Sequence, residues 1–343
     1  MMEVTWKSPS NIALIKYWGK YGTQLPRNPS LSLTLEEAFT RTTVAIEKKR
    51  SRKPSCTLLL DGQPQPAFEA KVLTYLQTIA GEMPLIKSHH LSIQTHNSFP
   101  HSSGIASSAS AMSALAMCLC SLHLMNGGKA PENVYSWASH LARLGSGSAA
   151  RSIFPGMSLW GKATGILESS NKYAIGYPTN YHMNFNDIQD TILLVSKKEK
   201  AVSSRAGHAL MQNHPMARQR FKNAKVRLDQ LLVVLEKGDW NAFIELVEAE
   251  ALELHALMMT SHPSYLLMRP ETLAIIEKIR AFREKTQLPV CFTLDAGPNV
   301  HVLYPYYEKR KVRNFIQKEL LPYCEDQVPI YDHMGRGPIQ ELS

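Results

Sequence analysis

Residues 97–124 constrain the fold most, because this segment joins a loop of small, hydroxyl-rich residues to an almost wholly apolar run. The apolar run, residues 111–124, predicts a helix that is buried on most sides. Backbone N–H groups and the dipole at a helix N-terminus favour a bound anion, and small side chains let a phosphate approach them. A serine N-cap on an ordinary core helix is the alternative.

The composition fits a globular chain with an anionic partner. The 343 residues suggest two domains or one large one, and 44% hydrophobic with 20% charged residues can form a sizeable core. The net charge of +9 suits nucleic acid, a membrane surface or a phosphorylated metabolite. The basic clusters at 48–53 and 309–313 do not interleave with exposed aromatic residues, so we expect solvated faces and no nucleic-acid partner.

Several features predict a cytoplasmic protein without a membrane partner. The first ten residues are polar and lack the apolar run of a secretory signal. The run at 111–124 is too short to span a bilayer. The five cysteines have no metal-like spacing, and their odd number fits a reducing compartment.

A first polar motif spans residues 8–20. In it, a short apolar run is followed by two lysines and a tyrosine. Lys16 and Lys20 suit phosphate oxygens, because an ammonium group is a compact point charge. Tyr17 offers a hydroxyl donor at the end of an apolar body. A strand end with solvated lysines is the alternative.

A second loop of small residues, 142–152, contains Gly-Ser-Gly-Ser at 145–148 and then Arg151. Its glycines permit a tight backbone path, and its serines place two hydroxyls on that path. The guanidinium of Arg151 can bind a carboxylate or phosphate in a bidentate manner. Taken alone, the loop favours a helix–helix connection that carries a solvated arginine; beside the other motifs, it favours a binding site.

Asp295 stands at the end of a predicted strand, in a hairpin whose turn contains glycine, proline and asparagine. A carboxylate held on a rigid hairpin is placed to accept a proton. The alternative is an aspartate that starts the turn and caps its own backbone.

Two other polar groups have simpler interpretations. Ser203 and Ser204 suit the N-cap of the next helix, a role that is compatible with ligand binding. The spacing of four further polar residues gives no shared metal face, so we expect them to form one solvated stripe: Glu248, Glu250, Glu253 and His255.

Hydrophobic periodicity predicts an α+β chain that is rich in strands in its first half and in long helices after it. Expected strands are 26–35, 41–47, 56–60, 89–95, 157–160 and 192–195. Further expected helices are 70–79, 131–144, 215–237, 241–259, 270–283 and 306–321. The polar region at 171–187 is the expected boundary, which divides the chain into domains 1–187 and 188–343.

The loop Pro100-His-Ser-Ser-Gly-Ile-Ala-Ser-Ser-Ala109 resembles the phosphate-binding loop of the GHMP kinase superfamily, whose pattern is Pro-x-x-x-Gly-Leu-Ala-Ser-Ser-Ala. Within that superfamily, three motifs are similar to those of the diphosphomevalonate decarboxylases. They are Lys16-Tyr-Trp-Gly-Lys20, the Gly-Ser-Gly-Ser-Ala-x-Arg-Ser run that ends at Ser152, and Phe292-Thr-Leu-Asp-Ala-Gly-Pro-Asn299. The resemblance covers most of the chain. His101 departs from the family pattern, and we expect it to lie at the surface.

The resemblance implies the two-domain GHMP kinase fold, in which an N-terminal α+β domain like that of ribosomal protein S5 precedes a ferredoxin-like domain. It also implies a reaction. ATP and mevalonate 5-diphosphate would yield isopentenyl diphosphate, carbon dioxide, ADP and phosphate, with Mg²⁺ as the metal and a homodimer as the assembly.

The site residues implied by the resemblance fall into three groups. The catalytic residues would be Lys16, Arg151 and Asp295. The substrate would contact Asn11, Tyr17, Lys20, Ser146, Ser148, Ser204 and Arg205. ATP would contact Pro100, Ser103, Gly104, Ala106, Ser107 and Ser108, with Ser107 also on the metal.

Two alternatives of different class stay open. A small-molecule kinase or decarboxylase of the same superfamily would act on mevalonate or mevalonate 5-phosphate. A basic RNA-binding module would fit the ribosomal-like domain and the positive charge, although the charge is scattered and no stacking platform is evident. Asp295 favours the decarboxylase over a plain kinase.

Overall fold

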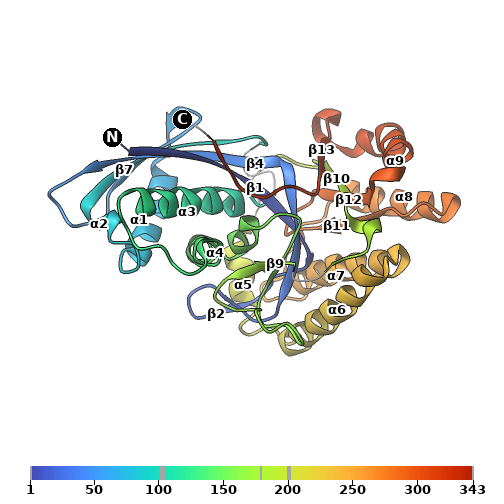
Figure 1. Ribbon diagram of the computed structural model, residues 1–343. Coiled ribbons are helices and arrows are strands. Elements are labelled where there is room, and N and C mark those ends of the chain that lie inside the picture. The colour runs from blue at the N-terminus through green and yellow to red at the C-terminus, as the bar shows by residue number, and fades with distance from the viewer. Residues whose placement is uncertain (1, 101–104, 178–179, 199–201, 342–343) are drawn as a thin grey trace.

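The computed structural model describes residues 2–100, 105–177, 180–198 and 202–341. It contains two main β-sheets, one built largely from each half of the chain, with helices packed on them (Figure 1). The prediction of an α+β fold is confirmed.

The first sheet has eight strands in the order β14-β1-β4-β7-β5-β6, and β8 and β9 extend it from β4. All of its pairings are antiparallel except that of β5 with β7. Its strands are β1 (Met2–Ile15), β4 (Ser30–Lys48), β5 (Cys56–Leu60), β6 (Gln63–Pro64), β7 (His89–Asn97), β8 (Met157–Trp160), β9 (Ala174–Gly176) and β14 (Ile339–Glu341). A small hairpin of β2 (Lys20–Tyr21) and β3 (Leu25–Pro26) leaves the sheet after β1.

The two strands expected at 26–35 and 41–47 form a single strand, β4, which begins at Ser30. The predicted start of the first strand and the predicted break between the two are therefore wrong. One end of β4 pairs with β8 and the other with β7, and between these ladders Leu35 forms an isolated bridge with Met334. The Asp332 carboxylate accepts the backbone N–H groups of Glu36, Glu37 and Ala38 at 2.7–2.9 Å. A distant side chain thus supplies the acceptors that the sheet lacks there.

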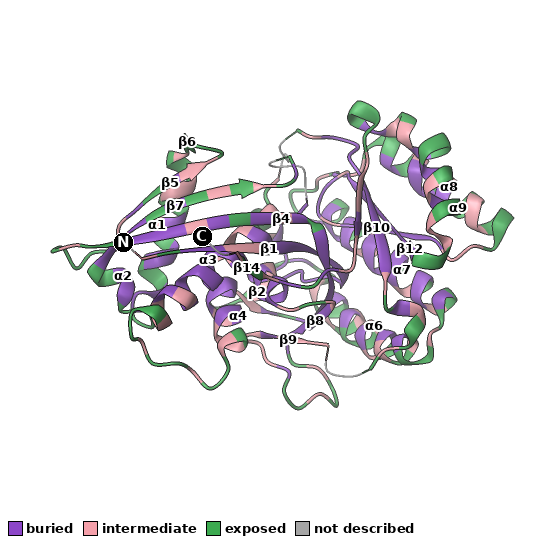
Figure 2. Cartoon of the chain, turned by 45° about the horizontal axis from the view of Figure 1, so that its top comes forward, coloured by how far each residue is buried: buried purple, intermediate pink, exposed green. Residues whose placement is uncertain are grey.

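Helices of the first half cover one face of this sheet (Figure 1). They are α1 (Pro66–Ile79), the short α2 (Leu85–Ser88), α3 (Ser107–Met125) and α4 (Val134–Gly145), followed by a 3₁₀ segment at Gly147–Ile153. The core lies between them and β1, β4, β5 and β7. In Figure 2, the buried residues of β4 and α3 are purple. The helix expected at 111–124 is confirmed and begins four residues earlier, at Ser107.

The helix α3 has 19 residues and is long and apolar enough to cross a membrane by length and composition alone, contrary to the expectation that the run is too short. Most of its apolar window is buried, against β1 and β4 of the first sheet. A mostly buried core helix also meets these criteria of length and composition.

The second sheet is fully antiparallel, in the order β11-β12-β10-β13. Its strands are β10 (Ile188–Leu193), β11 (Cys291–Leu294), β12 (Val300–Pro305) and β13 (Ile330–His333). The helices of this half are α5 (Ser204–Leu210), α6 (Ala217–Lys237), α7 (Trp240–Met259), α8 (Pro270–Thr286) and α9 (Lys309–Phe315), and a short 3₁₀ turn, Met183–Phe185, precedes β10.

The helix expected at 306–321 is interrupted. A 3₁₀ turn at Tyr306–Glu308 precedes α9, a π-helical turn at Ile316–Leu320 follows it, and two 3₁₀ turns end the segment at Leu321–Tyr323 and Glu325–Gln327. The apolar periodicity continues through these changes, because Val312, Phe315, Ile316 and Leu320 are all buried in one core cluster.

The basic cluster at 309–313 lies beside exposed aromatic side chains, contrary to expectation. Tyr306 and Tyr307 are exposed, and the Lys309 ammonium lies 5.1 Å from the centre of the Tyr306 ring. Lys311 pairs with Glu308, and Arg313 lies over Tyr331, so two cations of the cluster have partners within the chain.

Candidate active site

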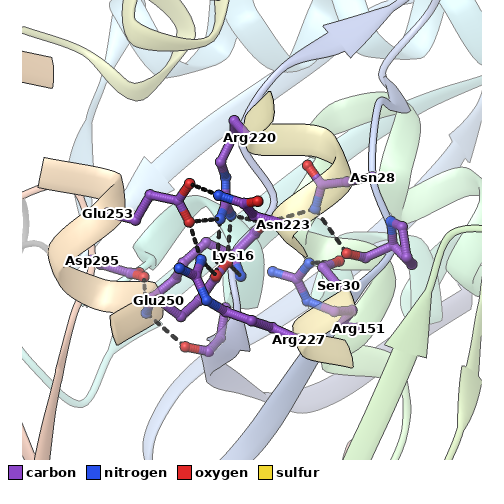
Figure 3. A network of polar contacts seen from close by, with 12 residues as sticks. Lys16, Asn28, Ser30, Arg151, Arg220, Asn223, Arg227, Glu250, Glu253 and Asp295 are labelled. Carbon is purple, nitrogen blue, oxygen red and sulfur yellow. Dashed lines mark hydrogen bonds and ion pairs between the residues drawn. The ribbon is translucent and has the colours of Figure 1, made fainter. Parts of the chain in front are cut away.

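Lys16 is buried directly after β1, with 1% of its side chain exposed. Its Nζ donates to the Ala13 carbonyl at 2.6 Å and lies 3.4 Å from Oδ1 of Asp295 (Figure 3). Burial lowers the pKa of Lys16, and the negative charge of Asp295 opposes that change. The alternative of a solvated lysine at a strand end is therefore wrong for Lys16.

Asp295 follows β11 on a hairpin that is anchored at several points. Its backbone carbonyl accepts hydrogen bonds from Gly297 N–H at 2.8 Å and from Nε2 of His255 at 3.0 Å. The Asn299 side chain bonds both the N–H and the carbonyl of Ser196. The Asp295 carboxylate is 29% exposed and faces Lys16, so the rigid hairpin presents it toward the space beside that ammonium.

Arg151 lies in the 3₁₀ segment after α4 and is almost fully buried. Its guanidinium donates to the Ser30 hydroxyl and, at 3.4 Å, to Oδ1 of Asn11. Asn11 in turn donates to the Ser148 carbonyl and the Ser152 hydroxyl. Burial lowers the pKa of Arg151 to about 10, with Asp295 opposing, so the group stays cationic at neutral pH. The alternative of a solvated arginine is wrong.

Tyr17 lies in an aromatic stack with ring-centre distances of 4.6 Å to Trp160 and 4.3 Å to His208. Its hydroxyl is buried and has no hydrogen-bond partner among the described residues. Burial raises the pKa of Tyr17, so the group is a neutral donor. A buried, unsatisfied hydroxyl beside two buried cations indicates that a ligand completes its hydrogen bonding.

His208, on α5, is a site residue that the sequence did not reveal. Its Nδ1 accepts the Gly19 N–H at 3.0 Å, and its ring packs between Tyr17 and Trp18. Burial, with the positive charges of Lys20 and Arg151, lowers the pKa of His208 to about 3, so the imidazole is neutral. A lone histidine on a short helix carries no motif, so only the tertiary contacts identify it.

Lys20 and Arg205 lie close enough to repel each other. Burial lowers the pKa of Lys20, and Arg205 adds to the effect. Lys20 donates to Oε1 of Gln24 at 2.9 Å. Ser204 and Arg205 form the first turn of α5, whose N-cap is Ser203, as expected. Two cations held near each other are typical of a site for a polyanion.

The anion-binding prediction for α3 has partial structural support. Ala106 has a left-handed φ of +32°, the helix begins at Ser107, and no side chain caps it. The first N–H groups of α3 thus have no side-chain acceptor in the cap. Pro100 is exposed at the other end of the loop, while Ser103, Gly104 and His101 lie outside the described residues.

The structure brings the two serine-rich loops together. The Ser108 hydroxyl lies 3.1 Å from that of Ser146, which lies 3.4 Å from that of Ser148. The start of α3 is therefore adjacent to the loop that carries Arg151. In the described ranges, no group of three or more His, Cys, Asp or Glu side chains could hold a metal ion.

The expected solvated stripe is wrong. His255 is buried, and its Nε2 donates to the Asp295 carbonyl. Glu250 is fully buried and pairs with Arg220 and Arg227, and Glu248 is buried and pairs with residues of α8. The arginines lie on other helices, so the pairing could not be read from the spacing of the glutamates alone.

Comparison with known proteins gives a consistent result across the chain. Residues 8–173 match the diphosphomevalonate decarboxylase-like N-terminal domain, and residues 191–335 match the mevalonate 5-diphosphate decarboxylase C-terminal domain. The diphosphomevalonate decarboxylase of Ganoderma lucidum is 30% identical, over 98% of this chain and 87% of that protein.

Solved structures show the same likeness. The structure of MDDEF in complex with MVAPP, AMPPCP and magnesium superposes with a TM-score of 0.84 at 29% identity, covering 100% of this chain and 99% of that one. The mevalonate diphosphate decarboxylase of Staphylococcus aureus gives 0.85 at 26% identity, covering 99% and 98%. Motifs, buried site and full-length likeness agree, and the chain belongs to the diphosphomevalonate decarboxylase family.

Proposed function

We propose that this chain catalyses the ATP-dependent decarboxylation of mevalonate 5-diphosphate to isopentenyl diphosphate, in the mevalonate route to isoprenoids. The observation that carries the proposal is the convergence of Lys16, Arg151 and Asp295, from three distant segments, beside the uncapped start of α3. The family and the ligands of its solved members support the same reaction.

The triphosphate of ATP would lie at the N-terminus of α3, where backbone donors and the hydroxyls of Ser107 and Ser108 are available. Pro100, Ser103, Gly104 and Ala106 would form the rest of the loop. The Ser107 hydroxyl would be a protein ligand of Mg²⁺, which keeps few protein ligands in such sites. When bound, it would neutralise charge on the phosphates.

The substrate diphosphate would bind Lys20, Ser204 and Arg205, where two cations already lie close together. Tyr17 would donate its unsatisfied hydroxyl to the same ligand. Ser146 and Ser148 would contribute hydroxyls between this end and the phosphate loop.

The carboxylate of the substrate would bind the guanidinium of Arg151, which Asn11 and Ser30 hold in place. A planar guanidinium binds a carboxylate through two parallel hydrogen bonds. This contact fixes the orientation of the bond that breaks.

Asp295 would take the proton of the C3 hydroxyl as the oxygen attacks the γ-phosphoryl group of ATP. The tertiary hydroxyl is a poor leaving group, and its phosphate ester is a good one. Loss of phosphate leaves C3 electron-deficient, and the electron pair of the breaking C–CO₂ bond forms the new double bond. Lys16, 3.4 Å from Asp295, would balance the negative charge in this step.

A coupled assay with carboxyl-labelled substrate tests the proposal. Mevalonate 5-diphosphate with ATP and Mg²⁺ is expected to release labelled carbon dioxide and ADP in equal amounts. Mevalonate and mevalonate 5-phosphate are tested as alternative substrates in parallel reactions. Release of ADP without carbon dioxide would identify a kinase instead.

We also propose that the chain divides at 187/188 and that it acts as a homodimer in the cytoplasm. All five cysteines are buried with free thiols, as expected in a reducing compartment. Light scattering on the protein as it elutes from a size-exclusion column would test the oligomeric state. The mass of a monomer would contradict the proposed homodimer.

A further inference from the structure

The peptide groups of Lys16 are held by side chains from the second half of the chain (Figure 3). The Lys16 N–H donates to Oε1 of Glu250 at 2.9 Å. The Lys16 carbonyl accepts from Nη2 of Arg220 at 3.1 Å and from Nδ2 of Asn28 at 2.9 Å. Both backbone polar groups of this one residue are thus bound by members of a single ion pair and by Asn28.

The ion pair that holds Lys16 is fully enclosed. Arg220 and Glu250 are each 0% exposed, and the pair is bidentate, with Nη1 of Arg220 2.8 Å from Oε2 of Glu250. Arg227 donates to the same carboxylate at 2.8 Å, and Asn223 donates to the adjacent Glu253. A buried, multiply bonded pair has little freedom to move, so it fixes the peptides that it touches.

The placement of the Lys16 ammonium depends on its backbone. The side chain turns back to donate to the Ala13 carbonyl, three residues earlier, and reaches Asp295 at 3.4 Å. Because the side chain is buried and folded on its own strand end, a displacement of the peptide also displaces the ammonium.

We infer that Glu250 and Arg220 are positioning residues, which hold the Lys16 peptide so that its ammonium stays against Asp295 during the reaction. The expected effect on the rate rests on the proposed function, because Lys16 and Asp295 take part in the proposed reaction. Its structural content, the location of the ammonium, does not depend on turnover.

The charges that face Lys16 come from several elements. Asp295 on the β11–β12 hairpin and Glu250 on α7 favour the charged ammonium, whereas Arg151 disfavours it. A change at Glu250 therefore alters the charge near Lys16 as well as its position. A change of Arg220 to lysine keeps the charge and removes the guanidinium fork that binds both Glu250 and the Lys16 carbonyl.

The kinetic test compares Glu250→Gln and Arg220→Lys with Glu248→Gln. Glu248 is also buried on α7 and also pairs with arginines, Arg280 and Arg283, but makes no contact with Lys16 among the described residues. Displacement of a reacting group by about 1 Å can cost ~100-fold in rate. We expect kcat to fall about 10- to 100-fold in Glu250→Gln and about 10-fold in Arg220→Lys. The KM for ATP should stay within a few-fold, and Glu248→Gln should keep the parent kcat.

An NMR titration separates positioning from general destabilisation. The protein is labelled with [ε-¹³C]lysine, and the Lys16 signal is assigned from its loss in Lys16→Arg. In Arg220→Lys, which changes no formal charge, we expect the Lys16 midpoint to differ from that of the parent, because the ammonium has moved relative to Asp295 and to its buried surroundings. In Glu248→Gln the midpoint should not move.

An unchanged Lys16 midpoint in Arg220→Lys would overturn the inference, as would equal losses of kcat in Glu250→Gln and Glu248→Gln. If the parent protein releases no carbon dioxide, the proposed function fails, and the titration still decides whether the ion pair positions Lys16. Thermal unfolding of each variant confirms that a folded protein was measured.

Discussion

Lys16 and Arg151 are cations that the fold removes from water, and the carboxylate of Asp295 offsets part of the desolvation penalty of both. Burial strengthens every charge interaction between them, because the local dielectric constant is lower than that of water. This arrangement makes the site sensitive to changes that remove one charge or alter its geometry.

Asp295→Asn should be the most damaging conservative change. The side chain keeps its size, so the hairpin should fold, but the proton acceptor and the negative charge beside Lys16 are lost. General-base assistance typically contributes ~10²–10⁴-fold, so we expect turnover to fall at least that far. ATP binding, measured by calorimetry, should stay within a few-fold. Turnover close to the parent's would reduce Asp295 to a turn residue.

Arg151→Lys should lose activity although the charge is kept. A lysine cannot form the bidentate contact with a carboxylate, nor reach both Ser30 and Asn11. A lost charge-assisted hydrogen bond is worth ~1.5–3 kcal/mol, so we expect kcat/KM to fall about 10- to 100-fold.

The control for this variant is Arg143→Lys. Arg143 is equally buried, on α4, and donates to the carbonyls of Lys172 and Thr23 instead of to site residues. If both substitutions cost the same activity, the effect of Arg151→Lys is structural.

At the scale of elements, the 3₁₀ segment Gly147–Ile153 is packed against the Tyr17 stack. A Cβ on Gly147 would lie 2.7 Å from Cε1 and 2.8 Å from the hydroxyl of Tyr17. The ring cannot move aside easily, because Trp160 and His208 flank it. The glycine is thus required by close approach between two elements of the site.

Gly147→Ala should therefore displace Tyr17 and raise the KM for mevalonate 5-diphosphate, with a loss of stability of about 1–3 kcal/mol from overpacking. Gly81→Ala is the matched control, since nothing lies within 4 Å of a Cβ at that position. Steady-state kinetics and thermal unfolding of both variants give the comparison. A Gly147→Ala enzyme with the parent KM would mean that Tyr17 does not contact the substrate.

Elements formed by local periodicity could be predicted from the sequence, and those decided by distant partners could not. The apolar run predicted α3, and the alternating residues at 89–95 predicted most of β7. The continuity of β4 depends on Asp332, nearly 300 residues away, and the burial of Glu250 depends on Arg220. Within the site, motifs identified Lys16, Arg151 and Asp295, whereas His208 and Ser30 are recognised only by contact.

At the scale of the whole molecule, the two halves are linked by buried and half-buried charges. Glu36 in β4 accepts from both the backbone N–H and the guanidinium of Arg336, at 2.9 and 2.8 Å. Burial raises the pKa of Glu36, but the contacts with Arg336 and Lys7 outweigh it and leave the pKa below its usual value of 4.5. The ionised carboxylate is thus preferred in the folded protein.

This preference sets a direction for the pH dependence of stability. A carboxyl group with a lowered folded-state pKa stabilises the protein above its unfolded pKa, and the contribution disappears as pH falls through about 4.5 and below. Glu36→Gln should lower the free energy of unfolding by about 1 kcal/mol at pH 7 and by less near pH 3.

Urea unfolding at both pH values measures the difference for Glu36. The control is Glu319→Gln, which removes an exposed pair with Lys278 and should change little at either pH. A loss in Glu36→Gln that is equal at pH 3 and pH 7 would show that the charge of Glu36 is not responsible.

The pairing of β14 with β1 joins residues that lie far apart along the chain. Thr5, Trp6 and Lys7 pair with Glu341, Gln340 and Ile339, so this edge of the first sheet stays open until β14 has left the ribosome. At ~5–20 residues per second, that delay is roughly 15–70 s. During this time the nascent chain exposes an unpaired strand edge to other chains, and chaperones that cover such edges would act at this stage.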